Sequence, residues 1–93
     1  MVFEWDPRKA ATNTRKHGVD FHDAATVFGD PLSTTFPDPD HSAREERYLI
    51  IGMSRRGRVL VIAHTQLGEK IRIISARLAT RSERTYYEET KRK

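Results

Sequence analysis

The sequence contains no cysteine, which excludes a disulfide framework and a metal site built on thiolates. No apolar run approaches the roughly 18 residues that a membrane helix requires, and residues 1–11 lack the apolar stretch of a secretion signal. No two histidines have metal-ligand spacing, and no glycine-rich phosphate loop is present. We therefore expect a cytoplasmic protein that binds no membrane and uses neither a metal nor another cofactor.

The chain is short, and its charge is unevenly distributed. Its 93 residues allow one domain, spanning 1–93, whose thin core a partner or a second copy would help to stabilise. The net charge is +4, yet residues 1–53 carry more acids than bases. Residues 54–81 hold one acid, Glu69, against seven bases, which are Arg55, Arg56, Arg58, Lys70, Arg72, Arg77 and Arg81. Such segregation is typical of a face that binds a polyanion, although a solvated charged surface gives the same pattern.

Capping residues indicate two helices in the N-terminal third. Asp6 is a favoured N-cap for a helix over 7–17, and Gly18 is a natural residue to end it. Asp20 has the same role for a second helix over 21–28, whose apolar residues follow helical spacing. The two segments together predict a helical hairpin.

Apolar and alternating segments predict five strands, at 3–5, 32–36, 47–54, 58–65 and 70–77. Residues 37–42 are rich in turn formers and are expected to form a loop. Thr80 and Glu83 form a capping box that begins a C-terminal helix. The order is β-α-α-β-β-β-β-α, an α+β fold in which the N-terminal helices pack on an antiparallel meander sheet. The last three strands are apolar at both parities, so both of their faces are expected to be covered.

Four blocks of residues form a recognisable combination along nearly the whole chain. The first block contains Phe3, Trp5, Asp6, Lys9, Ala10, Asn13, the run Lys16-His17-Gly18-Val19, and Phe21. The others are Ile51-Gly52, Ser54 and Gly57-Arg58, then Ile71-Arg72-Ile73-Ile74-Ser75-Ala76-Arg77, and finally Glu83-Arg84 with Tyr87-Glu88. In combination they resemble the BrnT family of type II toxins.

The resemblance implies a RelE/ParE-like fold and a ribonuclease whose activity stops translation. It also implies a cognate antitoxin, BrnA-like, that carries a ribbon-helix-helix DNA-binding part. The antitoxin would neutralise the toxin, and operator DNA would be bound only through the complex of the two. On this basis we expect a metal-independent endoribonuclease acting on RNA, either free or bound to the ribosome.

Three arginines near strand ends and the start of the last helix are the candidates for stabilising a phosphorane transition state. Arg58 opens a strand, Arg77 closes the next one, and Arg81 lies in the first helical turn, where a cation is unfavourable unless it serves an anion. Strand alternation directs Arg72 to the face opposite Arg77, so Arg72 ranks lower. For each of these residues, a solvated or ion-paired surface arginine is the alternative.

Proton transfer and base stacking require other residue types. His17, at the end of the first predicted helix, is the candidate for acid–base catalysis, because a helix C-terminus favours the imidazolium form. The alternative is a plain capping residue. The remaining residues assigned to RNA binding are Arg55, Arg56, Lys70, Arg72, Tyr86 and Tyr87. Core packing is the alternative for at least one of the two tyrosines.

Two other functions are compatible with the same residues. The basic sheet could hold RNA or a protein without cleaving anything, as a binding module does. Alternatively, the chain could be a toxin directed at DNA gyrase, as the wider RelE/ParE group allows. Incubation with RNA, with and without ribosomes, separates these possibilities.

Overall fold

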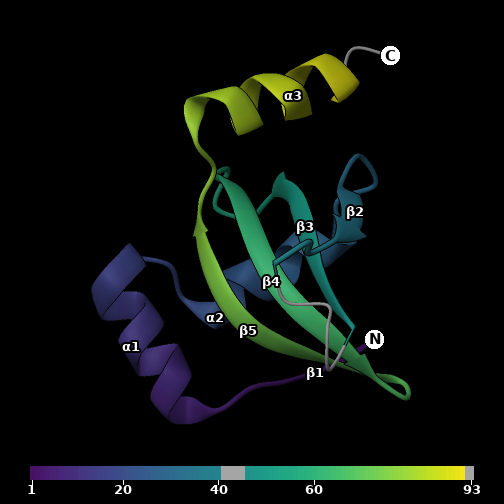
Figure 1. Cartoon of the computed structure of the whole chain (residues 1–93). Helices are drawn as coiled ribbons and strands as arrows, with labels where there is room; N and C mark the ends of the chain where they lie inside the picture. Colours follow the sequence, from purple (N-terminus) through teal and green to yellow (C-terminus); the bar gives the residue numbers. More distant parts are fainter. Residues whose placement is uncertain (41–45, 92–93) are drawn as a thin grey trace.

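The computed structural model describes residues 1–40 and 46–91, which form a five-stranded sheet with helices around it (Figure 1). The elements are β1 Val2–Glu4, α1 Pro7–His17, α2 Phe21–Thr26, the 3-10 turn η1 Val27–Gly29, β2 Thr34–Pro37, β3 Arg47–Met53, β4 Val59–Leu67, β5 Lys70–Leu78 and α3 Arg81–Lys91. The spatial order of the strands is β1-β5-β4-β3-β2. The end of the predicted loop, residues 41 and 42, lies outside the described residues. None of the described helices is long and apolar enough to cross a membrane.

The strands from β2 to β5 form the antiparallel meander that the sequence predicts. The edge strand β1 differs, because it pairs with β5 in parallel, with Phe3 opposite Ile71. No hairpin joins these two strands, because β1 ends at Glu4 and β5 begins only at Lys70. The prediction of an antiparallel sheet is therefore right for four strands and wrong for β1.

The predicted capping residues begin and end the helices as expected. Asp6 accepts a hydrogen bond of 2.8 Å from the backbone of Arg8, and Asp20 accepts one of 2.6 Å from His22. Gly18 ends α1 with a φ of 67°, a left-handed conformation that suits glycine. The second helix is shorter than predicted, because the chain tightens into η1 after Thr26.

The capping box at the start of α3 is present in full. The carboxylate of Glu83 accepts a hydrogen bond of 2.8 Å from the backbone of Thr80. In return, the hydroxyl of Thr80 accepts one of 3.2 Å from the backbone of Glu83. This exchange fixes the direction in which α3 leaves the sheet.

Both faces of the sheet carry apolar clusters, which confirms the prediction that the central strands are covered on two sides. The helical face buries Val19, Phe21, Ala24, Val27, Ile50, Leu60, Ile62, Ile73 and Ala76. The opposite face buries a smaller cluster of Ile51, Val59, Val61 and Tyr87. Tyr87 comes from α3, so this helix covers one end of the second face (Figure 1).

An irregularity in β5 changes the direction of its arginines. Ala63 pairs with Ser75 and His64 pairs with Ile73, so Ile74 is an extra residue without a partner of its own on β4. Such a bulge resets the alternation of side chains along the strand. Consistent with this, Ile73 and Ala76 both lie in the helical-face cluster despite their odd separation. Residues 72 and 77 therefore face the same side, and the prediction that they face opposite sides is wrong.

Candidate nucleic-acid interface

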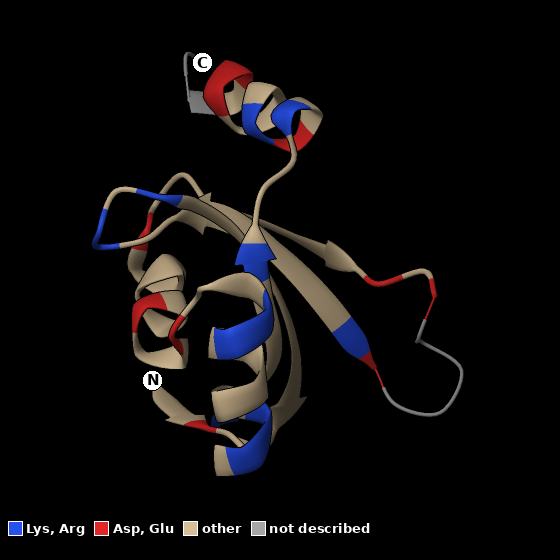
Figure 2. Ribbon diagram, turned by 90° about the vertical axis from the view of Figure 1, so that its left-hand side faces the viewer, with Lys and Arg blue, Asp and Glu red and all other residues tan. Residues whose placement is uncertain are grey.

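One end of the sheet gathers the start of β4, the end of β5 and the start of α3. Leu60 pairs with Leu78, and the backbone of Ala79 donates a hydrogen bond of 2.9 Å to the carbonyl of Val59. Figure 2 shows that basic residues mark the β3–β4 turn, the end of β5 and the C-terminal part of α1 around this region. Arg58 and Arg77 therefore lie at the same end of the sheet, and Arg81 follows at the start of α3. We refer to this region, residues 15–17, 54–58 and 77–86, as the basic end.

Arg58 connects the β3–β4 turn to the helical hairpin. Its guanidinium donates to the carbonyl of Gly18 and to the carboxylate of Asp23, each at 3.1 Å. The side chain of Asp23 is only 4% exposed. Burial opposes ionisation of Asp23, but hydrogen bonds from Ser54 and Arg58 outweigh it and hold the pKa of this carboxyl below its ordinary value. Arg58 thus uses much of its hydrogen-bonding capacity inside the protein, and its Nε is buried without a partner among the described residues.

The two arginines of the turn itself are arranged differently. Their backbone groups are fixed, because the amide of Arg55 donates to the hydroxyl of Thr26 at 2.7 Å and that of Arg56 donates to Asp23 at 3.3 Å. Their side chains are exposed, and neither makes a hydrogen bond or ion pair within the part of the chain that the structure describes. A rigid turn therefore presents two unpaired guanidinium groups to solvent.

A hollow of about 270 Å³ lies between α2 and this turn. It is lined by Asp20, His22, Asp23, Thr26, Arg55 and Arg56. His22 is not among the site residues predicted from the sequence, because the turn that lies beside it is more than thirty residues further along the chain. The strand pattern places the turn at one end of the sheet but does not reveal which helix it contacts.

Arg77 lies on the other face of the sheet. It forms a bidentate pair with Glu83, with N–O distances of 2.7 and 3.0 Å. The hydrogen bond from Arg77 is the main reason that the pKa of Glu83 falls to about 2. Arg58 contacts α2 on the helical face, whereas Arg77 follows Ala76 and points away from that face. The structure therefore does not bring Arg58 and Arg77 into one cleft, because the strand pleat separates them.

Arg81 and the two tyrosines belong to α3. Arg81 is exposed and lines a hollow of about 530 Å³ together with Thr80, Ser82 and Thr85. Tyr86 is 49% exposed and presents a ring to solvent. Tyr87 is 2% exposed, and its hydroxyl donates to Asp30 at 2.6 Å. The prediction of a stacking surface is therefore wrong for Tyr87, which packs in the core instead.

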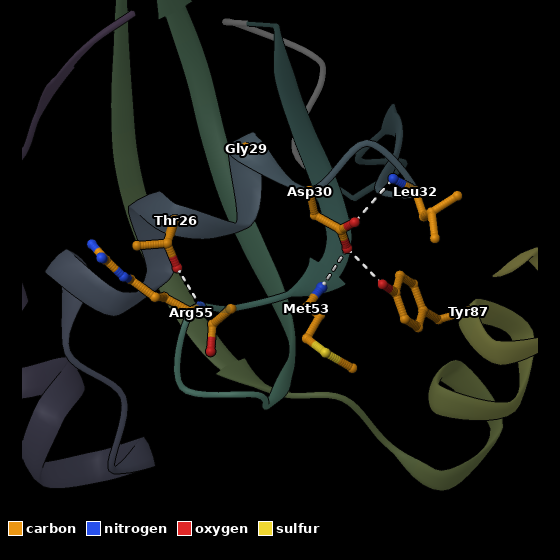
Figure 3. A pocket seen from close by; sticks show the side chains of 8 residues that line it. Thr26, Gly29, Asp30, Leu32, Met53, Arg55 and Tyr87 are labelled. Atoms are coloured by element: carbon orange, nitrogen blue, oxygen red, sulfur yellow. Dashed lines mark hydrogen bonds between the residues drawn. The ribbon is translucent and has the colours of Figure 1, made fainter.

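Asp30 lies in a groove between α3 and the sheet. The groove has a volume of about 510 Å³ and is lined by Thr26, Gly29, Asp30, Leu32, Met53, Ser54, Arg55 and Tyr87 (Figure 3). Burial and the hydrogen bond with Asp30 raise the pKa of Tyr87 to about 12. In Figure 3 the guanidinium of Arg55 points away from Asp30 and Tyr87, towards α2. Arg55 thus lines two cavities, and its charge lies at the one beside α2.

The remaining predicted residues lie apart from the hollow beside α2. His17 is exposed at the end of α1, one residue before the carbonyl that Arg58 binds, and it does not line the hollow. Lys70 and Arg72 lie at the start of β5, roughly 20 Å along the strand from Arg77. Arg72 is paired with Glu4 at 3.1 Å. These two basic residues therefore lie at the end of the sheet opposite the basic end.

Metal-binding residues do not gather in the described residues. Within 1–40 and 46–91, no three side chains of histidine, cysteine, aspartate or glutamate are arranged to hold an ion. The ionisable groups available at the basic end are guanidinium, ammonium, imidazole and carboxylate groups.

A mixed sheet, two helices on one face and unpaired arginines at one end define a class of small, basic α+β proteins suited to binding phosphates. Residues 5–83 match the sequence model of a family described as "Ribonuclease toxin, BrnT, of type II toxin-antitoxin system". The chain belongs to this BrnT family.

The fold is also similar to a solved structure, the 1.1 Å crystal structure of the ribonuclease toxin BrnT of Brucella abortus. The sequences are 27% identical, the TM-score is 0.68, and the match covers 87% of this chain and all of the Brucella chain. No curated protein matches the sequence.

Proposed function

We propose that this protein is a metal-independent endoribonuclease that binds RNA at the basic end and cleaves it there. The observation that carries the proposal is a group of three exposed arginines, Arg55, Arg56 and Arg81, whose side chains have no partner among the described residues. Unpaired guanidinium groups suit the bidentate binding of phosphates. The BrnT description as a ribonuclease toxin supports RNA as the polyanion.

The chemistry needs no metal if three tasks are met. The 2′-hydroxyl must lose a proton, the phosphorane must be stabilised, and the 5′-oxygen must gain a proton. We assign phosphate binding to Arg55, Arg56 and Arg81, and flanking contacts to Tyr86. Arg58 positions the β3–β4 turn through its contacts with Asp23 and Gly18. Arg77, which is paired with Glu83, provides a further guanidinium group for the phosphate.

His17 is our first candidate for one of the proton transfers. Its ring is exposed, and it precedes the residue that Arg58 binds. Lys70 and Arg72 lie at the start of β5, far from the basic end. They would contact the RNA only if the RNA strand extends along the whole length of the sheet. We therefore assign them to non-specific phosphate contacts.

The cellular consequences follow from the substrate. Cleavage of messenger RNA, free or ribosome-bound, would inhibit translation, so we expect the toxin to act in the cytoplasm. We also infer that the fold is RelE/ParE-like, on the basis of the four-stranded antiparallel meander and the two N-terminal helices on one face. Incorporation of labelled amino acids after induction of the toxin measures the effect on translation.

A type II toxin has an antitoxin as its partner. We propose that this partner is BrnA-like, with a ribbon-helix-helix part, that operator DNA is bound only through the complex, and that the antitoxin covers part of residues 54–81. Exposed apolar side chains beside the arginines support a protein contact here, since Leu78 is 51% exposed. Hydrogen exchange of the toxin with and without antitoxin tests this, and unchanged exchange throughout residues 54–81 would contradict it.

The decisive experiment for the proposed activity uses the purified toxin, free of antitoxin. It is incubated with RNA, with and without ribosomes, in the presence of a chelator. We expect products with 2′,3′-cyclic phosphate and 5′-hydroxyl ends, and a loss of at least tenfold in rate for the double variant Arg55→Ala/Arg56→Ala. The matched control is Lys9→Gln, which removes an exposed charge from the first turn of α1 and is expected to leave the rate unchanged.

Three outcomes separate the possible functions. Cleavage with chelator present supports the proposal. RNA binding without cleavage under either condition would indicate a binding module. Inhibition of gyrase supercoiling without any effect on RNA would indicate a gyrase-directed toxin.

A further inference from the structure

The hollow between α2 and the β3–β4 turn combines binding groups with a proton-transfer group. It is lined by His22 and by Arg55 and Arg56, whose guanidinium groups have no partner among the described residues. Its volume of about 270 Å³ is ample for a phosphate group with part of a ribose. No other hollow described above contains both arginines and a histidine.

The ring of His22 is held on one side and open on the other. It packs edge-on against Trp5, with ring centroids 4.9 Å apart and an interplanar angle of 85°. Its backbone amide is fixed by the N-cap residue Asp20. The ring is exposed and makes no hydrogen bond within the described ranges. Both ring nitrogens are therefore available to a ligand, while the packing against Trp5 restricts the ring's orientation.

The hollow contains charged groups of both signs beside His22. Asp20 and Asp23 contribute negative charge, and Asp23 is neutralised by its pair with Arg58. Arg55 and Arg56 contribute two positive charges that no described acid neutralises. The hollow is therefore electropositive until an anion enters it.

We propose that this hollow binds the scissile phosphodiester of RNA and that His22, rather than His17, is the catalytic residue that accepts the proton of the 2′-hydroxyl. The inference rests on the proposed ribonuclease function and adds a residue to it. Arg55 and Arg56 hold the non-bridging oxygens, where negative charge grows in the transition state. Arg58 and Asp23 act as positioning residues, because they fix the turn on α2.

The reaction is a transesterification that needs no further reagent. A neutral ring nitrogen of His22 takes the proton of the 2′-hydroxyl as the O2′–P bond forms. The P–O5′ bond breaks, and the leaving oxygen takes a proton from water. The hydroxide formed then takes the proton from the imidazolium, which restores His22. The products are a 2′,3′-cyclic phosphate and a 5′-hydroxyl.

The test compares His22→Gln with the wild type and with Lys9→Gln in steady-state cleavage of a short RNA, from pH 5 to 9. We expect His22→Gln to lower kcat at least 100-fold with KM changed less than threefold, as loss of a general base does. The acidic limb of the pH profile, which an imidazole base produces, should disappear. Arg55→Ala should raise KM and also lower kcat, because its guanidinium contacts the phosphate in both the ground state and the transition state. Cleavage by His22→Gln within threefold of the wild type, with an unchanged pH profile, would overturn the assignment.

A second measurement works without cleavage or a mutant. Inorganic phosphate is added to the isotope-labelled wild-type protein, and the imidazole resonances of His22 and the guanidinium resonances of Arg55 and Arg56 are followed. We expect these signals to shift together, with Lys9 unaffected. Absence of any shift would refute the hollow as a phosphate site even if the wild type cleaves RNA. If the wild type cleaves no RNA and the signals do shift, the proposed function fails while the anion site is retained.

Discussion

The hydroxyl of Tyr87 donates a hydrogen bond of 2.6 Å to the carboxylate of Asp30, across 57 residues of sequence. The same carboxylate accepts hydrogen bonds from the backbone of Met53 at 2.8 Å and of Leu32 at 2.9 Å (Figure 3). One carboxylate therefore joins α3, the end of β3 and the chain that leads into β2. Since α3 otherwise extends beyond the sheet, this junction fixes its position (Figure 1).

Replacement of Tyr87 by phenylalanine tests this junction. The variant keeps the buried ring and removes the hydroxyl, so the free energy of unfolding should fall by about 1.5–3 kcal/mol, as expected for a hydrogen bond to a charged group. Urea denaturation provides the measurement. Tyr86→Phe is the matched control, because Tyr86 is exposed on the same helix and its change should stay within about 0.5 kcal/mol. Equal values for the two variants would contradict the role of the junction.

The same hydrogen bond predicts a dependence on alkaline pH. The pKa of Tyr87 is raised from 10.0 to about 12, so the folded state holds this proton more tightly than the unfolded state does. The contribution to stability is complete below pH 10 and is lost as the pH rises towards 12. The difference in unfolding free energy between the wild type and Tyr87→Phe should therefore narrow across this window. A difference that stays constant from pH 9 to 12 would show that the hydroxyl is not responsible.

His64 predicts a loss of stability in the acidic range. It is 6% exposed between the rings of Phe28 and Tyr48, and neither ring nitrogen has a partner among the described residues. Burial lowers its pKa from 6.5 to about 4, so the unfolded state binds the proton more readily. The contribution to stability is complete above pH 6.5 and is lost as the pH falls towards 4.

The loss attributable to His64 is about 3 kcal/mol between pH 7 and 4. His64→Phe, which cannot be protonated, should show a flatter profile of unfolding free energy in this range. Carboxylates such as Glu83 also contribute to acid sensitivity, but they are common to both proteins and cancel in the comparison. Parallel profiles for the two proteins would contradict the assignment to His64.

Much of the fold could be predicted from the sequence, because local signals were strong. The caps at Asp6, Asp20 and Thr80 each make the predicted side-chain contacts, since a cap depends only on residues within one turn. The bulge at Ile74 could not be foreseen, because an extra residue in one strand is defined only relative to the neighbouring strand. For this reason the faces of Arg72 and Arg77 were assigned incorrectly.

The candidate site was predicted less completely than the fold. The charge segregation identified the basic segment, and its arginines other than Arg72 lie at one end of the sheet. The partners of Arg58 and Arg77, which are Asp23 and Glu83, depend on the packing of helices against the sheet. His22 was missed for the same reason, since only the docking of the turn on α2 brings it beside two arginines.

Asn13 predicts a large loss of stability on truncation. Its amide donates to the carbonyls of Val19 and Ala76 at 2.9 and 2.8 Å, and its oxygen accepts from the backbone of Ala76 at 3.0 Å. Asn13→Ala would leave both backbone groups of Ala76 without their side-chain partner and the carbonyl of Val19 with only a 3.5 Å hydrogen bond from Thr14. The free energy of unfolding should therefore fall by about 2–4 kcal/mol. Thr12→Ala, on an exposed position of the same helix, should change stability by less than about 0.5 kcal/mol. A small effect for Asn13→Ala in thermal denaturation would mean that water replaces these contacts.

Arg77 and Glu83 allow a catalytic role to be separated from a structural one. Arg77→Ala should lower RNA cleavage at least tenfold if its charge serves the phosphate. Glu83→Gln removes the neutralising carboxylate but keeps an oxygen that can accept from Thr80 and preserve the cap. It should therefore strengthen RNA binding and steepen its dependence on salt, because Arg77 becomes available to the phosphate backbone.

Both variants break the ion pair and should lose similar stability, so a purely structural role predicts the same direction of change in RNA binding for both. Opposite changes in affinity, measured by fluorescence anisotropy at two salt concentrations, would assign Arg77 to the RNA.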